Sequence, residues 1–98
     1  MKFDSFEWDE SKRCSNIEKH NVDFEEILDL FDTFLYEIPD NRRGYGEKRT
    51  IAFGELEKQI YCPVYTRMLR PDRTLRLSIK VTTCHFSLPT FLSLLNRI

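Results

Sequence analysis

The chain has 98 residues and a mass of 11.8 kDa, which leaves room for a single domain, residues 1–98, with one modest hydrophobic core. Hydrophobic residues make up 41% and aromatic residues 13% of it, so we expect a folded rather than a disordered protein. An acidic start and the lack of a long apolar run argue against a signal peptide or a membrane span and favour a cytoplasmic location. The three cysteines are too widely spaced for a zinc motif or a disulfide framework, so we expect free thiols and no metal site.

The formal net charge of −1 hides a separation of charge along the chain. Residues 1–40 contain 4 Lys and Arg against 12 Asp and Glu, a net charge of −8, whereas residues 41–98 contain 11 against 4, a net charge of +7. This asymmetry indicates a basic surface for nucleic acid or for an acidic partner. The alternative is that the two halves neutralise each other within one fold.

The first third of the chain carries helix signals after a short strand pattern. Phe6 and Trp8 alternate with polar residues and are typical of a short opening strand. Asp9 as N-cap and Asn21 as the stop predict a helix over about residues 10–20.

A second helix is predicted directly afterwards. Asp23, with Glu26 three residues later, has the pattern of a capping box. Apolar residues then follow at helical spacing, which predicts an amphipathic helix over residues 24–31 built on Phe24, Ile27, Leu28 and Phe31.

From residue 34 onward the apolar period changes to two, which is typical of strands with one buried face. Pro63 removes a backbone donor and favours an edge position or a bulge for its strand. No helix separates these strands, so they should be antiparallel. We therefore expect an α+β fold with two N-terminal helices, a mainly antiparallel four-stranded sheet over residues 34–38, 51–53, 59–66 and 75–81, and a short C-terminal helix that carries Leu88, Phe91, Leu92 and Leu95.

Basic side chains gather in the loop after the first of these strands. Guanidinium groups bind phosphate and stabilise its transition-state charge, and a tyrosine ring can stack on a base. A solvated turn is the alternative. The loop residues concerned are Arg42, Arg43, Tyr45, Glu47, Lys48 and Arg49.

Two further groups could contact RNA. Arg76 and Lys80 alternate with Leu77 and Ile79, so we expect both cations on the sheet face away from the core, as a phosphate-binding surface or as ordinary exposed charge. His20 follows Lys19, and imidazole is the side chain best suited to proton transfer near neutral pH, although both residues also suit a helix C-terminus.

Taken in order, the segments FEWDESK, IEKHNVDFEE, RGYGEKR, IAFG and VYTR, with the pair Phe31 and Asp32, resemble the BrnT family of bacterial toxins from type II toxin–antitoxin modules over about residues 6–67. The resemblance implies a fold related to the RelE-like ribonuclease toxins and a translation-blocking endoribonuclease. It also implies a BrnA-type antitoxin that neutralises the toxin and supplies the binding to operator DNA. A homodimer or a heterotetramer with the antitoxin is compatible with it.

Carried over by position, the resemblance implies catalytic roles for Lys19, His20, Arg43, Glu47, Arg49 and Arg67. From the basic loop and the basic strand described above we expect RNA binding by Arg42, Tyr45, Lys48, Arg76 and Lys80. His20 and Glu47 are the acid–base candidates, and the catalytic cations would bind phosphate or stabilise the transition state. We predict a metal-independent enzyme without a cofactor and without membrane contact. After Val81 the apolar sequence departs from the charged family pattern, so the alternative is a toxin remnant that binds protein or RNA without cutting.

Overall fold

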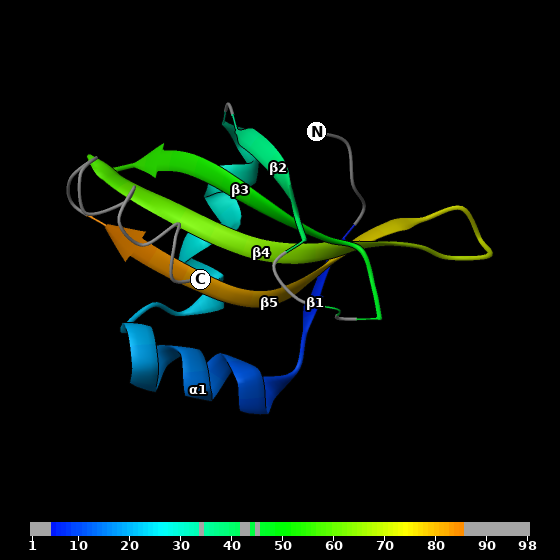
Figure 1. Ribbon diagram of the computed structural model, residues 1–98, viewed down its shortest axis with the longest axis horizontal. Coiled ribbons are helices and arrows are strands. Elements are labelled where there is room, and N and C mark those ends of the chain that lie inside the picture. The colour runs from blue at the N-terminus through cyan, green and yellow to red at the C-terminus, as the bar shows by residue number, and fades with distance from the viewer. Residues whose placement is uncertain (1–4, 34, 42–43, 45, 86–98) are drawn as a thin grey trace.

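The structure is a computed structural model that describes residues 5–33, 35–41, 44 and 46–85 (Figure 1). Five strands form one mixed sheet in the order β1-β5-β4-β3-β2. The α+β class is thus confirmed, but the sheet has five strands rather than the predicted four, because the opening strand joins it. The elements are β1 (Ser5–Trp8), α1 (Glu10–His20), the 3-10 helix η1 (Phe24–Asp32), β2 (Tyr36–Asp40), β3 (Arg49–Leu56), β4 (Gln59–Leu69) and β5 (Leu75–His85). The predicted C-terminal helix lies outside the described residues.

Helix α1 has the limits that the sequence predicts. The Asp9 carboxylate accepts hydrogen bonds from the backbone N–H groups of Ser11, at 2.8 Å, and Lys12, at 3.4 Å. At the other end, Asn21 adopts a left-handed conformation with φ of 56°, and its N–H donates to the carbonyl of Ile17. Both ends are therefore set by local hydrogen bonds, which is why the sequence alone could place them.

The second helix, η1, is a 3-10 helix rather than the predicted α-helix. The predicted capping box of Asp23 and Glu26 is present at its start. The fully buried side chains Phe24, Ile27 and Leu30 recur at a spacing of three. Because a 3-10 helix has three residues per turn, this spacing aligns them on one side of the helix, facing the sheet.

The opening strand β1 runs parallel to β5 at the edge of the sheet, so the prediction of a four-stranded, mainly antiparallel sheet is wrong in this part. Phe6 lies opposite Leu77, and Trp8 lies opposite Ile79. Phe6 and Trp8 also pack against the hydrophobic core. The gain in buried aromatic surface explains why a four-residue strand joins the sheet at this edge.

Pro63 lies in β4, which is flanked by β5 and β3, and not at an edge as one of the two predicted alternatives had it. It sits opposite Thr82 of β5. The pairs between β3 and β4 stop at Ile51 with Val64 and resume at Gly54 with Tyr61, so the missing donor falls where this ladder is interrupted.

The core lies between the sheet and η1, which covers the rear face of the sheet in Figure 1. Gly54 of β3 permits a close approach of η1, because a Cβ atom at this position would lie 2.7 Å from a methyl carbon of Leu30. Helix α1 lies beside β5 instead (Figure 1). The core cluster consists of Val22, Phe24, Ile27, Phe31, Ala52, Tyr65, Leu77 and Ile79.

Candidate active site

Helix α1 is fixed to β5 by one buried side chain. Strand β1 pairs with β5 as far as Ile79, and Asn16, which is 4% exposed, occupies the edge beyond it. The Asn16 amide Nδ2 donates to the carbonyls of Val22, at 2.8 Å, and Thr82, at 2.9 Å, and Oδ1 accepts the N–H of Thr82 at 3.0 Å. The side chain thus satisfies the backbone groups of the strand edge, as a neighbouring strand would.

A cleft of about 270 Å³ lies between α1, β3 and β5, and we call it the α1 cleft. It brings together four of the residues predicted to act on RNA, from three distant parts of the chain, and the basic residue Lys12. These are Lys19 and His20 at the end of α1, Arg49 of β3 and Lys80 of β5. Lys12 was missed by sequence reasoning, although its place seven residues before Lys19 puts it on the same side of the helix.

Lys80 reaches the cleft because of an irregularity in β5. Val64 of β4 pairs with Val81, and the next residue, Tyr65, pairs with Ile79, so Lys80 is the extra residue of a β-bulge. The bulge also takes Val81 away from the core face occupied by Ile79 and into the lining of the cleft. The uninterrupted alternation predicted for residues 75–81 is therefore wrong after Ile79.

Glu47 joins the two sheet cations of the cleft. Its carboxylate accepts a hydrogen bond from Arg49 Nε at 3.0 Å and lies 3.7 Å from Lys80 Nζ. Partial burial raises the pKa of Glu47, but the hydrogen bond from Arg49 and the charges of Lys80, Arg49 and Lys12 together lower it below its usual value. Glu47 is therefore an anion at neutral pH, and it holds two cations beside the cleft.

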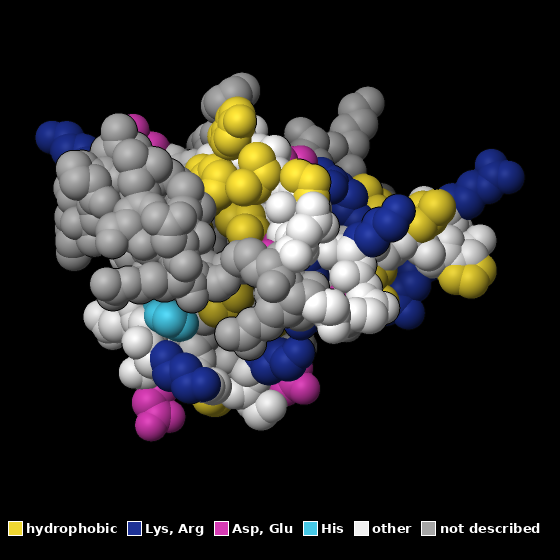
Figure 2. All heavy atoms as spheres, in the orientation of Figure 1, with side chains coloured by type: hydrophobic (Ala, Val, Ile, Leu, Met, Phe, Trp, Pro, Cys, Tyr) yellow, Lys and Arg dark blue, Asp and Glu magenta, His cyan; other side chains and the backbone are white. Residues whose placement is uncertain are grey.

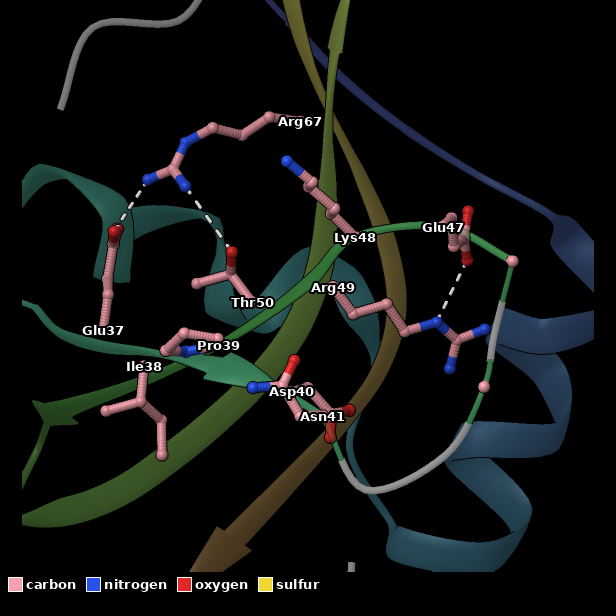
Figure 3. Close-up of a pocket in the computed structure, with 12 residues that line it drawn as sticks. Glu37, Ile38, Pro39, Asp40, Asn41, Glu47, Lys48, Arg49, Thr50 and Arg67 are labelled. Atoms are coloured by element: carbon pink, nitrogen blue, oxygen red, sulfur yellow. Dashed lines mark hydrogen bonds and ion pairs between the residues drawn. The ribbon is translucent and has the colours of Figure 1, made fainter.

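Arg67 and Lys48 lie outside the lining of the α1 cleft. They line a second pocket of about 750 Å³, which Glu47 and Arg49 also line, so Arg49 borders both hollows while Glu47 belongs to the second pocket alone. Figure 3 shows Lys48 beside Arg67, while the Arg49 side chain extends away from them toward Glu47. Arg67 donates to Glu37 at 2.7 Å. The structure therefore does not bring Arg67 to His20 and Lys19, which line the α1 cleft.

The remaining predicted residues are Arg76, Arg42, Arg43 and Tyr45. Arg76 lies near the start of β5, opposite Ser5 of β1, and does not belong to the lining of the α1 cleft. Arg42, Arg43 and Tyr45 lie outside the described residues. Figure 2 shows Lys and Arg side chains over α1 and toward the projecting turn between β4 and β5, on the face of the sheet away from η1.

An α+β domain that gathers a histidine and several cations in one open cleft has the features of a protein that acts on a phosphate-rich polymer. The family described as the ribonuclease toxin BrnT of type II toxin–antitoxin systems matches residues 8–79, and the chain belongs to this family. Its fold is similar to the crystal structure of the Brucella abortus ribonuclease toxin BrnT, with a TM-score of 0.61 and 26% identity, covering 82% of this chain and 94% of that chain. No curated protein sequence matches the chain.

Within the ranges given above, no group of three or more His, Cys, Asp and Glu side chains is arranged to hold a metal ion. In the same part of the chain, no helix is long and apolar enough to cross a membrane.

Proposed function

We propose that the α1 cleft is the active site of an RNA-cleaving toxin that inhibits translation. The observation that carries the proposal is the convergence of Lys19, His20, Arg49 and Lys80 on one cleft. Arg49 and Lys80 are 20% and 17% exposed, so water screens their charges less than it would at an open surface. Such cations stabilise the charge that develops on phosphate during cleavage.

The chemistry that suits these groups uses the 2′-hydroxyl of RNA as the nucleophile. A base removes its proton, the 2′ oxygen bonds to phosphorus, the bond to the 5′ oxygen breaks, and an acid protonates that oxygen. Glu47 is ionised, so it can accept a proton but has none to donate at neutral pH. His20 is therefore the proposed acid and Glu47 the proposed base, while the products are a 2′,3′-cyclic phosphate and a 5′-hydroxyl.

The proposal includes independence from metal ions, because protein cations supply the positive charge that the transition state needs. We propose that Arg67 and Lys48 bind RNA outside the cleft, from the second pocket, which adjoins the cleft through Arg49. Their position suits contacts with phosphates farther along the strand.

The proposed inhibitor is a BrnA-type antitoxin that covers the α1 cleft and also supplies operator-DNA binding. An acidic antitoxin segment suits the excess of positive charge in residues 41–98. Its association should slow as salt rises, because exposed charges are screened over about 8 Å at physiological ionic strength. Light scattering of the toxin alone and of the complex distinguishes a toxin homodimer from a heterotetramer.

Cleavage of end-labelled RNA by the purified protein in EDTA tests the proposal. We expect cleavage by the wild type and a loss of about 10²-fold or more in Arg49→Ala, since this change removes a transition-state cation. Lys58→Ala is the matched control, because Lys58 is an exposed cation in the turn between β3 and β4. Equal rates for all three proteins would contradict the proposal.

One observation favours the alternative of a binding module without catalysis. The family match ends at Ile79, so Lys80 and the rest of the chain lie beyond it. A toxin remnant would bind RNA or an acidic protein through the same cations without cutting. A protein that binds RNA in the assay above but leaves it intact would establish this alternative.

A further inference from the structure

A second hollow adjoins the α1 cleft. It has a volume of about 350 Å³ and lies where β1 and the start of α1 meet β4 and β5, and we call it the Ser78 depression. Lys12 and Lys80 line both the depression and the cleft. The two hollows therefore share a boundary made by two cations, and a chain bound in one can continue into the other.

The walls of the Ser78 depression combine apolar and polar groups. Met68 of β4 provides an adaptable apolar surface, and Ser78 of β5, which is 7% exposed, provides a hydroxyl that can both donate and accept a hydrogen bond. The volume is at the lower end of the range found for small-molecule sites, about 300 to 1,000 Å³. One nucleotide, with its flat face and polar edge, suits such a space.

Acidic residues of the depression already have partners. Glu7 lies 2.9 Å from a guanidinium nitrogen of Arg70, and the Asp9 carboxylate accepts hydrogen bonds from the backbone and hydroxyl of Ser11. These contacts reduce the repulsion that the two carboxylates would exert on a phosphate.

A further cation lies beyond the depression. Arg76 is two residues before Ser78 on β5, which places it about 6.6 Å along the strand, on the side away from Lys80. Among the described residues, the buried Nε of Arg76 has no hydrogen-bond partner. The strand therefore offers cations before and after the depression, as a bound nucleotide with a phosphate on each side requires.

We propose that the Ser78 depression is a second subsite of the ribonuclease, which holds a third nucleotide, next to the two nucleotides that the cleaved bond joins in the α1 cleft. The substrate is then single-stranded RNA of at least three nucleotides, because a base must leave its helical stack to enter the depression. This inference rests on the proposed function and adds the length and form of the RNA.

Binding of short RNAs tests the subsite. The probes are a dinucleotide that spans the cleavage position and two trinucleotides that extend it at the 5′ or the 3′ end, each with a 2′-deoxy sugar at the cleavage position to prevent reaction. Competition with a fluorescent RNA gives the affinities. We expect one trinucleotide to bind the wild type about fivefold or more tightly than the dinucleotide, as contacts with one further base provide.

Variants of the depression should remove this preference and leave dinucleotide binding unchanged. Ser78→Leu fills the space, and Met68→Ala removes the apolar wall and decides the test if the first variant does not fold. The matched control is Leu69→Ala, since Leu69 is the next residue on β4 and is 75% exposed. It should retain the wild-type preference.

Equal affinities of the wild type for the dinucleotide and both trinucleotides would overturn the subsite. A preference that survives in a folded variant of the depression would also overturn it, because the third nucleotide would then bind elsewhere. The proposed function fails separately, if trinucleotides with ordinary sugars bind with the expected preference but are not cleaved.

Discussion

Replacing Asn16 by alanine should lower the stability of the fold and disturb the α1 cleft without touching any proposed catalytic group. The change removes three buried hydrogen bonds, two to Thr82 and one to Val22. Each contributes about 1 kcal/mol net, so we expect a loss of about 3 kcal/mol in the free energy of unfolding. For a chain of this size the midpoint of thermal unfolding should fall by more than about 10 °C.

Thermal unfolding followed by circular dichroism measures this effect. Cys14→Ala is a matched control on the same helix, because Cys14 is exposed and its change should leave the midpoint within about 2 °C of the wild type. A midpoint for Asn16→Ala as high as that of the control would refute the account of how α1 is held against β5.

Three further outcomes follow from single contacts. Glu47→Gln should slow RNA cleavage and flatten the rise in rate at acidic pH, because the pKa of Glu47 is lowered and only its ionised form accepts a proton; a pH–rate profile measures this. Tyr65→Phe should cost about 2 kcal/mol in urea unfolding, because the phenol donates to the Glu37 carboxylate at 2.6 Å. The hydrogen bond from Arg13 lowers the pKa of Asp23 in the folded state. The ionised Asp23 therefore stabilises the fold above the unfolded pKa of about 3.9, and this contribution is lost as the pH falls through the folded pKa. The difference in midpoint between the wild type and Asp23→Asn should therefore shrink below about pH 4.

Local signals in the sequence were sufficient to predict the limits of α1 and the start of η1. The N-cap of Asp9, the left-handed Asn21 and the capping box of Asp23 involve residues within four positions of each other, so a sequence pattern contains the whole interaction. The sequence did not show that η1 is a 3-10 helix rather than an α-helix. The predicted apolar face included Leu28, at α-helical spacing, whereas the structure buries Leu30, at a spacing of three from Ile27.

Features that depend on distant contacts were not predictable from patterns. The parallel pairing of β1 with β5 joins residues about seventy positions apart, as does the contact of Asn16 with Thr82. The bulge that turns Lys80 toward α1 depends on how β4 and β5 align. For the same reason the sequence indicated which residue types suit action on RNA, but it could not separate Arg67 from Lys19 and His20, which line another hollow.

The direct measurement of the central claim is the cleavage of two RNAs by His20→Ala under single-turnover conditions. One RNA has an ordinary linkage, and the other has sulfur in place of the 5′ oxygen, a leaving group that departs without protonation. If His20 is the acid of the α1 cleft, the variant should cut ordinary RNA about 10²-fold or more slowly than the wild type and the sulfur-containing RNA at nearly the wild-type rate. Cleavage of ordinary RNA by His20→Ala at the wild-type rate would contradict the assignment of the α1 cleft as the active site.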